Sequence, residues 1–571
     1  MATVIGDNIL SPLGFTTTEN LQAVRAGKTA LRHFDSAEGI PFPFTAALFS
    51  KDQMDSLRTE GLTRFESLSY QSIKEAIKEV PEVITDRTVL ILSSTKGNEA
   101  LLKNSDNSDN ITHLGKAAKK ISDKLGLTQS PIVVSNACIS GVAAIILAAR
   151  LIDTDKAEYA IVCGVDEQSP FIISGFESLK ALSETECRPF DIERLGLNLG
   201  EASATIVLSK YSKDGGWKIS DGAIRNDGFH ISSPSPKGEG AYQTLSEILN
   251  GISAEELAVI NAHGTATMYN DQMESKAISR AGLSDVPTNA LKGFFGHTMG
   301  AAGVLETILT MHSVDDGVVL ATRNFEELGV SGKVNISASE RYTDKKRFVK
   351  MISGFGGGNA SILCSQGEED KEPAKNPGFT VSHRVVLTQD SLSVDGESVE
   401  ISKTGNKLLT HLYKDRVGDY PKFYKMDALS KLGFIATEIL LQAENAPENE
   451  NSISRSIAFF NRKASLNTDL AYLETINDKD NFFPSPSLFV YTLPNIVTGE
   501  IALRHHYFGE TNFFILPEKD FNQINDIIES MLCDKHTESI IGGWLECISS
   551  DIFEANIFIA NKNKYLLDEL N

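Results

Sequence analysis

Short runs of apolar and β-branched residues alternate with amphipathic stretches along the first two thirds of the chain. The segments TVLILSS at 88–94, AEYAIVCGV at 157–165, ATIVLSK at 204–210 and LAVINAHG at 257–264 have the length and composition of buried strands. Between them lie stretches with helical spacing of apolar positions, such as LTRFESLSYQSIKEAIKEV at 62–80. This alternation predicts βαβ units, and therefore an α/β fold with parallel or mixed sheets covered by helices.

One predicted strand-to-helix turn carries a cysteine. IVV at 132–134 predicts a buried strand, and GVAAIILAARLI at 141–152 is apolar on almost every face, which is typical of a fully buried helix. Cys138 lies between them, where free amide groups and the positive end of the helix dipole lower the pKa of a thiol. A small buried cysteine without chemistry is the alternative at this position, because free cysteine often behaves as a core hydrophobe.

Two histidines also follow strand-like segments. His263 ends LAVINAH and precedes a glycine, and His297 ends LKGFFGH and precedes a helix start rich in glycine and alanine. A lone histidine of this kind is more often structural than catalytic. Two of them, together with a helix-capped cysteine, suggest nucleophilic catalysis with handling of a proton or an oxyanion.

The glycine-rich stretch GFGGGN at 354–359 invites a phosphate-binding interpretation. A phosphate-binding loop has to open a helix, whereas the residues after this stretch predict a strand. We therefore interpret residues 351–364 as two strands joined by a glycine-rich turn.

Composition narrows the possible functions. The 571 residues include 54 basic and 76 acidic ones, a formal net charge of −22, so a nucleic-acid partner is not expected. The six cysteines are scattered without CxxC pairs, which predicts neither a metal site nor a disulfide framework. The sequence shows neither a signal-peptide pattern nor an apolar run long enough to span a membrane, and we expect a cytoplasmic protein.

The order of the motifs resembles the β-ketoacyl-acyl carrier protein synthases of the thiolase superfamily. The resemblance covers residues 1–365 and rests on NACISG around Cys138, AHGTAT around His263, KGFFGH around His297 and GFGGGN around Phe355. It implies a thiolase-like, five-layered αβαβα fold built from two similar halves, about 1–215 and 216–365.

The resemblance also implies a role for each matching residue. Cys138 would accept the acyl group, and His263 and His297 would promote decarboxylation of a malonyl thioester and stabilise its enolate. Lys292 and Glu274 would set the electrostatics of the histidine pair. The backbone amides of Cys138 and Phe355 would form the oxyanion hole, with Phe355 as a gate. Thr265 and Thr267 would contact the phosphopantetheine arm of an acyl carrier protein, and no further cofactor and no metal are implied.

Within this superfamily the motifs favour the elongating Cys-His-His type. A degradative thiolase would carry a second cysteine in the final glycine-rich turn, where this chain has Phe355. The initiating synthases carry asparagine where His297 stands. The non-enzymatic alternative is a carrier-protein-binding or chain-length scaffold for another synthase. The complete set of Cys138, the two histidines and Lys292 argues against that alternative.

Residues 366–378 are charged and contain proline and glycine, which predicts an exposed linker. Beyond it, residues 379–571 repeat features of the amino-terminal half in the same order. RVVLTQDSLSVDG at 384–396 resembles a first strand, KMDALSKLGFIATEIL at 425–440 echoes 64–77, and SIAFFNRKASLN at 456–467 echoes 88–99.

A fourth match sets Gly499 on Gly141 and would place Ile496 at the position of Cys138. The tail is therefore predicted to be an incomplete, degenerate amino-terminal-half synthase without a nucleophile. It resembles the chain-length-factor-like partners of synthases in aryl-polyene and flexirubin-type pathways. We expect it to dock in cis as a pseudo-dimer partner, with further oligomerisation open. The sequence leaves the primer, the chain length and the oxidation state of the product open.

Two basic clusters are candidates for docking an acidic carrier protein, KAAKK at 116–120 and KKRFVK at 345–350. A solvated surface is the alternative interpretation of both clusters.

Overall fold

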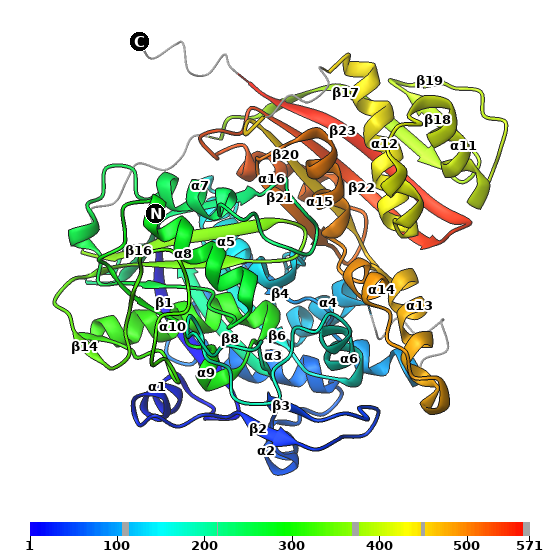
Figure 1. Cartoon of the computed structure of the whole chain (residues 1–571). Helices are drawn as coiled ribbons and strands as arrows, with labels where there is room; N and C mark the ends of the chain where they lie inside the picture. Colours follow the sequence, from blue (N-terminus) through cyan, green and yellow to red (C-terminus); the bar gives the residue numbers. More distant parts are fainter. Residues whose placement is uncertain (105–112, 214, 368–375, 447–451, 564–571) are drawn as a thin grey trace, which may run out of the picture.

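The computed structural model describes residues 1–104, 113–213, 215–367, 376–446 and 452–563 (Figure 1). The chain forms three units that share one sheet topology. The expected linker follows strand β16, and its residues 368–375 lie outside the described residues.

The first unit is built on a sheet with the strand order β5-β4-β6-β8-β1, in which β5, β4 and β6 are parallel and β8 is antiparallel to its neighbours. Its elements are β1 Ala2–Leu10, α1 Thr17–Arg25, β2 Arg32–Phe34, β3 Phe44–Ala47, α2 Lys51–Leu57, α3 Arg64–Ala76, η1 Pro81–Val83, β4 Thr88–Ser93, η2 Glu99–Asn104, α4 Leu114–Leu125, β5 Ile132–Val134, η4 Ala137–Ile139, α5 Ser140–Asp153, β6 Tyr159–Asp166, α6 Pro170–Ser178, β7 Leu199–Gly200 and β8 Ala202–Ser209.

The second unit repeats this order as β11-β10-β15-β16-β9, and β13 extends the sheet beyond β11. Its elements are β9 Trp217–Asn226, α7 Glu239–Ile248, η5 Ala254–Glu256, β10 Val259–Asn261, α8 Met268–Arg280, β11 Pro287–Asn289, α9 Lys292–Phe295, η6 Met299–Ala301, α10 Ala302–Asp315, β12 Val318–Val319, β13 Asn335–Ile336, β14 Arg341–Tyr342, β15 Arg347–Ser353 and β16 Gly358–Gln366.

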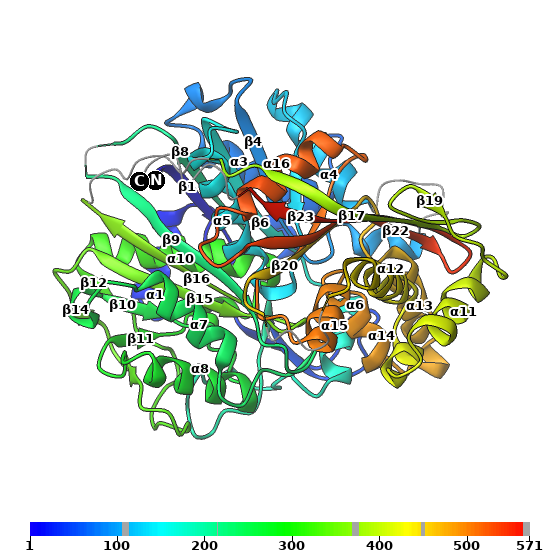
Figure 2. The same ribbon diagram turned by 90° about the horizontal axis from the view of Figure 1, so that it is seen from above.

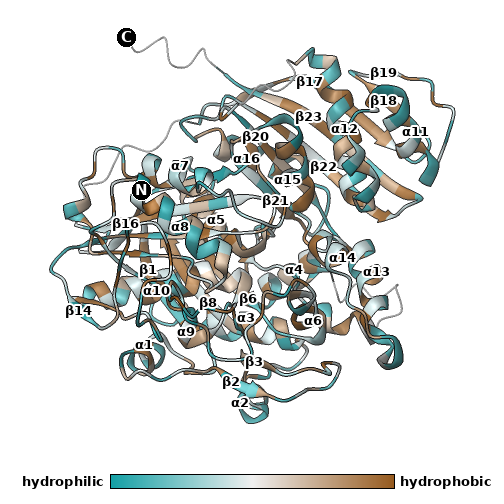
Figure 3. Cartoon of the chain, viewed as in Figure 1, coloured by the Kyte–Doolittle hydropathy of each residue, from teal (hydrophilic) through white to brown (hydrophobic). Residues whose placement is uncertain are grey.

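The two sheets enclose a central layer formed by α5 and α10, which pack against each other. Both helices are buried on nearly all sides, as the uniform apolar pattern of 141–152 predicts for α5. Helix α3 covers the outer face of the first sheet, and α7 and α8 cover that of the second. The resulting α/β/α/β/α sandwich confirms the five-layered thiolase-like fold. Figure 3 shows the hydrophobic segments concentrated in the strands and central helices.

The third unit, the C-terminal domain, has the order β21-β20-β22-β23-β17 and thus repeats the first unit. Its elements are β17 Phe379–Thr388, β18 Leu392–Val394, β19 Glu397–Ser398, α11 Asn406–Arg416, η7 Pro421–Lys425, α12 Ala428–Glu444, β20 Arg455–Asn461, α13 Leu466–Asn477, η8 Lys479–Asn481, α14 Pro486–Tyr491, α15 Ile496–His505, β21 Thr511–Ile515, α16 Phe521–Met531, β22 Ser539–Ser549 and β23 Ile552–Lys562. Figure 2 shows α12 and α15 on one face of its sheet and α16 on the other.

Three of the four internal matches fall on equivalent elements, and the fourth is wrong. Strand β17 corresponds to β1, helix α12 to α3, and strand β20 to β4. Helix α3 is capped by Thr63 and α12 by Asp427, each accepting from a backbone amide in the first turn.

The match of Gly499 with Gly141 fails because residues 486–491 form a helix, not a strand. Helix α15 lies between β20 and β21, in the place of α4. The counterpart of the nucleophile helix α5 is α16, so the counterpart of Cys138 lies between β21 and α16, not at Ile496. That turn, residues 516–520, reads LPEKD and contains no thiol.

The C-terminal domain continues the first sheet at its edge. Strand β21 pairs antiparallel with β5, with Phe514 opposite Val134 and Ile515 opposite Val133. Helix α16 packs against α5 across the same boundary. The nucleophile strand is therefore an inner strand of a sheet that both domains build.

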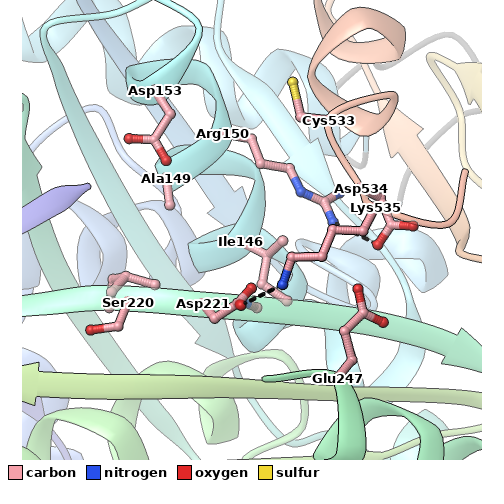
Figure 4. A pocket seen from close by; sticks show the side chains of 12 residues that line it. Ile146, Ala149, Arg150, Asp153, Ser220, Asp221, Glu247, Cys533, Asp534 and Lys535 are labelled. Atoms are coloured by element: carbon pink, nitrogen blue, oxygen red, sulfur yellow. Dashed lines mark hydrogen bonds and ion pairs between the residues drawn. The ribbon is translucent and has the colours of Figure 1, made fainter. Parts of the chain in front are cut away.

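A charged junction closes the boundary away from the nucleophile. It surrounds a polar cavity of 140 Å³ between the end of α5, strand β9, the end of α7 and the turn at 533–535 (Figure 4). Arg150 bonds Glu510 at 2.7 Å, Arg225 bonds Asp534 at 3.0 Å, and Lys535 bonds Asp221 at 2.9 Å. Glu247 completes the junction through an ion pair with Arg225.

Candidate active site

The nucleophile turn is fixed by its own short hydrogen bonds. The Ser140 hydroxyl accepts from the Asn136 amide at 2.8 Å and donates to the Ala137 carbonyl at 2.6 Å. Ala137 adopts a positive φ of 48°, which turns the chain from β5 into η4 and α5. Cys138 lies in this turn and is 8% exposed.

The structure brings the cysteine and the two histidines together. The Cys138 Sγ lies 3.0 Å from Nε2 of His297. The rings of His263 and His297 are edge to face, with centroids 5.0 Å apart. One donor atom from each of the three residues lies within 4.8 Å of the others. Zinc accepts the same ligand types, so geometry alone leaves metal binding as an alternative to acyl chemistry.

A backbone amide selects the tautomer of His297. The Met299 amide donates to His297 Nδ1 at 3.2 Å, so in the neutral ring the proton resides on Nε2. That N–H then points toward Cys138 Sγ. It can stabilise a thiolate, or donate to a thioester oxygen placed beside the sulfur.

The pKa of the thiol differs in direction from the sequence prediction. The position at a helix start predicts a lowered pKa, but burial raises the pKa of Cys138 to about 12, although the nearby Lys292 lowers it. The helix position is as expected, but desolvation outweighs it in this closed site. The thiolate therefore depends on local donors, such as His297.

Both imidazoles are held in the neutral form. Burial lowers the pKa of His263 and of His297 well below the usual value, and the positive charges of Lys292 and Lys350 act in the same direction. Neutral rings suit donation to a developing oxyanion.

Lys292 and Glu274 act on the backbone of the His263 turn. Lys292 Nζ donates to the His263 carbonyl at 2.6 Å and to Glu306 Oε1 at 2.8 Å. The Glu274 carboxylate accepts from the amides of His263 at 2.7 Å and Gly264 at 2.8 Å. Both predicted residues are thus at the site, where they hold the turn that presents His263.

Sequence reasoning missed two charged residues of this layer. Glu306 receives Lys292 on one oxygen and Lys350 on the other, and the side chains of all three are buried. The signal was available: Glu306 follows Val304 and Leu305 in α10, and Lys350 lies between Val349 and Met351 in β15. The cluster at 345–350 is accordingly not one docking face, because Lys350 points into the core.

The glycine-rich turn lies against the nucleophile. A Cβ on Gly354 would lie 3.1 Å from the amide nitrogen of Cys138, closer than most side-chain carbons approach a neighbouring atom. The Phe355 carbonyl accepts from Asn495 of the C-terminal domain at 2.8 Å, and the Gly356 amide donates to the Ile231 carbonyl at 2.7 Å. The turn is therefore held between the two domains.

A cavity of 360 Å³ leads from the surface to these residues. Cys138, the two histidines and Phe355 lie on its lining, as do Thr265 and Thr267, whose hydroxyls are 2.9 Å apart. Exposed apolar side chains also line it: Leu195, Met268 and Tyr269.

The C-terminal domain packs aromatic side chains behind Phe355. The Phe355 ring stacks on Phe176, and Phe489 of α14 meets Phe176 in an edge-to-face arrangement with 5.4 Å between centroids. Phe489 fits only because Gly175 has no side chain, since a Cβ there would lie 2.1 Å from the ring. The ring of Tyr472 in α13 packs against that of Phe489, with 5.4 Å between their centroids.

Comparison with known proteins agrees with this geometry. Residues 71–214 match the model of the β-ketoacyl synthase N-terminal domain, and residues 218–326 match that of its C-terminal domain. The chain is 29% identical over 410 residues to 3-oxoacyl-(acyl-carrier-protein) synthase 2 of Vibrio cholerae, which covers 63% of this chain and 97% of the relative. A putative mitochondrial 3-oxoacyl-(acyl-carrier-protein) synthase of Schizosaccharomyces pombe is 28% identical over 415 residues, with the same coverage.

Solved structures share this fold, and one of them does so over both domains. A ketosynthase from Xenorhabdus doucetiae, solved with its chain length factor, shares 25% identity and a TM-score of 0.55 over 64% of this chain and 98% of that one. The PfaC ketosynthase–chain length factor shares only 14% identity. Its fold matches with a TM-score of 0.78 over 98% of this chain and 78% of that one.

Fold and site thus define a condensing enzyme of the thiolase-like class. Residues 71–326 match the two domain models of the β-ketoacyl synthase family, and the chain as a whole has the fold of a ketosynthase–chain length factor. It is an acyltransferase of the ketosynthase type, which acts by condensation in fatty-acid or polyketide chain elongation. No helix among the described residues is long and apolar enough to cross a membrane.

Proposed function

We propose that Cys138 carries the growing acyl chain and that the enzyme joins it to malonyl-acyl carrier protein by decarboxylative Claisen condensation. The observation that carries this proposal is the 3.0 Å approach of Cys138 Sγ and His297 Nε2 at the inner end of the cavity. Cys138 is the nucleophile in this proposal, and His263 and His297 are the donors to the malonyl thioester.

The reaction then has two stages. The Cys138 thiolate attacks the acyl thioester, and the carrier's phosphopantetheine thiol leaves with a proton. In the second stage the malonyl thioester loses carbon dioxide while His263 and His297 donate to its carbonyl oxygen. The enolate carbon attacks the acyl group on Cys138, a carbon–carbon bond forms, and the sulfur leaves as thiolate. The amides of Cys138 and Phe355 are the proposed donors to the acyl oxyanion.

An acyl carrier protein is the proposed partner. Its phosphopantetheine arm would enter past Thr265 and Thr267, which line the cavity. The apolar side chains of Leu195, Met268 and Tyr269 at the lining offer a contact surface near that entrance. The arm is part of the substrate, so this proposal requires no separate cofactor.

The C-terminal domain is proposed to be a catalytically inactive partner that shapes the acyl-binding region. Asn512 bonds Asn136, two residues before Cys138, and the Phe513 amide donates to the same side chain at 2.7 Å. Asn495 holds the Phe355 carbonyl, and Phe489 packs on Phe176, which in turn stacks on Phe355. The turn that corresponds to the nucleophile turn contains no cysteine. These contacts are the basis for proposing that the domain supports the active site and limits the length of the acyl chain.

Replacing the nucleophile tests the proposal. Cys138→Ala should abolish both acyl capture and condensation, because no sulfur is left to form the thioester. Mass spectrometry of the intact protein after incubation with acyl-carrier protein measures capture, and product analysis measures condensation.

Cys547→Ala is the matched control, since it removes another buried thiol from the C-terminal domain. This variant should retain both activities. An acyl adduct of unchanged yield on the Cys138→Ala protein would show that the nucleophile is assigned wrongly.

A further inference from the structure

Strand β15 carries a second lysine into the core of the active site. Lys350 is 0% exposed, and its position pairs with Asn261 at the end of β10, two residues before His263. Taking an ammonium group out of water is strongly unfavourable unless an anion compensates it. A buried lysine beside a reaction centre therefore calls for a physical explanation.

The compensating anion is shared. Lys350 Nζ lies 2.5 Å from Glu306 Oε2 and 3.3 Å from the Ala262 carbonyl. Lys292 lies 2.8 Å from the other oxygen of Glu306. One carboxylate thus serves two ammonium groups, and this cluster has a surplus positive charge. Lys292 alone would already neutralise Glu306, so the surplus charge is due to Lys350.

Both ammonium groups lie at the His263 turn, Lys350 at the Ala262 carbonyl and Lys292 at the His263 carbonyl. The charged and titratable groups around the two imidazoles come from five elements: Cys138 on η4, Lys292 on α9 and Lys350 on β15, with Glu306 on α10 and Glu274 on α8 behind them. Only the two lysines among these groups carry positive charge, and both oppose protonation of the rings.

We propose that Lys350 is a positioning residue of the condensing site, a second buried cation that keeps His263 and His297 uncharged and the His263 turn in place. It touches neither substrate nor sulfur, and it acts through Glu306, the Ala262 carbonyl and the field at the histidines. This proposal rests on the proposed roles of the two histidines as neutral donors in decarboxylation.

The cation also supports the carboxylate that holds the His263 turn. Burial raises the pKa of Glu274 to about 7, and Lys350 opposes that rise. Without Lys350 the carboxyl would retain its proton to higher pH and accept the two turn amides less strongly. Loss of Lys350 would thus affect His263 in two ways. It would raise the pKa of the ring, and it would weaken the hydrogen bonds that the turn amides donate to Glu274.

The test compares Lys350→Gln, which removes the charge but keeps a hydrogen-bond donor, with Lys350→Arg, which keeps the charge. The measured quantity is the pH profile of malonyl decarboxylation, as kcat and as kcat/KM. Removing a nearby positive charge favours the imidazolium form, so the acidic limb of the Gln variant should move to higher pH by about one unit. The value of kcat should fall, and the KM for malonyl-carrier protein should stay constant. The Arg variant should keep the wild-type acidic limb.

A merely structural lysine would leave the acidic limb of the pH profile in place in both variants, and that result would overturn the proposal.

If the Gln variant does not fold, the alkaline limb of the pH profile of Lys350→Arg tests the proposal instead. Burial lowers the pKa of Lys350 to about 8, so wild-type decarboxylation should change as pH rises through that value. Arginine cannot lose its proton there, and Lys350→Arg should lack this change. An identical alkaline profile in both proteins would contradict the proposal. Failure of the Cys138→Ala test would instead refute the proposed nucleophile.

Discussion

At the scale of single residues, the site depends on how closely backbone groups approach the sulfur. The Gly354 turn lies against the Cys138 amide, and the Met299 amide sets the tautomer of His297. In both features the backbone makes the contact. Backbone geometry therefore places the donors before any substrate arrives, which is the condition for electrostatic stabilisation without reorganisation.

Gly354→Ala tests the proposed oxyanion hole at this scale. The new methyl group would crowd the Cys138 amide at 3.1 Å, and the kcat for condensation should fall by about 10²- to 10³-fold, the cost of losing one oxyanion donor. Gly542→Ala is the matched control, because its Cβ also meets a backbone atom at 3.1 Å, the Ala458 carbonyl oxygen, but far from the site. Equal losses of activity in the two variants would indicate general destabilisation.

The sequence predicts which residues form this site, but it does not predict the pKa of Cys138 or the burial of Lys350. Motif order was sufficient to bring Cys138, His263 and His297 together in the expected fold. It could not reveal the pKa of Cys138, because desolvation depends on the closed tertiary environment. It also misassigned Lys350 to a surface cluster, since strand alternation decides which basic residues point inward.

At the scale of elements, the C-terminal domain repeats the sheet topology of the first unit, and its helix α16, equivalent to α5, packs against α5 itself. Helix α16 directs Ile524, Ile527 and Ile528 into the core. The sequence revealed the repeat but not the position of this helix. A single matched glycine cannot show whether α15 or α16 is equivalent to α5. The strand order shows that it is α16, which follows β21 as α5 follows β5.

Substitutions of Phe489 test the proposed role of the C-terminal domain in limiting the length of the acyl chain. Shortening Phe489 on α14 removes the wall behind Phe176, so Phe489→Ala should give products longer by one or more two-carbon units. Product lengths are measured by mass spectrometry of the carrier-bound chains. Because a core Phe→Ala change costs about 3–5 kcal/mol of stability, Phe489→Leu should be compared as a milder change.

Tyr424→Ala, an exposed aromatic on η7 of the same domain, serves as the control and should leave product length unchanged. Unaltered lengths in both Phe489 variants would remove the support for a length-limiting wall.

At the scale of the whole molecule, the charged junction of Figure 4 makes the stability of the folded protein depend on pH. Glu247 of α7 meets Arg225 and, through it, Asp534 of the C-terminal domain. Burial and the nearby Asp534 raise the pKa of Glu247 to about 7. A carboxyl whose folded pKa is raised stabilises the fold below its unfolded pKa, and this contribution is lost as pH rises through the folded value.

Glu247→Gln should remove that dependence. Between pH 5 and pH 8 the wild-type free energy of unfolding should decline relative to the variant by about 2–3 kcal/mol, because folding raises the pKa of Glu247 from 4.5 to about 7. Denaturant unfolding of both proteins across this range measures the difference. A difference between the two proteins that does not vary with pH would show that Glu247 does not titrate in the folded state.

The pairing of β21 with β5 has a consequence for how the assembly forms. Separate chains at such an edge come apart on dilution, and their ratio depends on how much of each is made. Here one translation product supplies both sides, so each synthase is made with its partner half. The tether keeps the local concentration of that half high however dilute the protein becomes. With β5 already paired, a second copy of the synthase cannot occupy this edge, and the gene fixes the ratio at one synthase to one C-terminal domain.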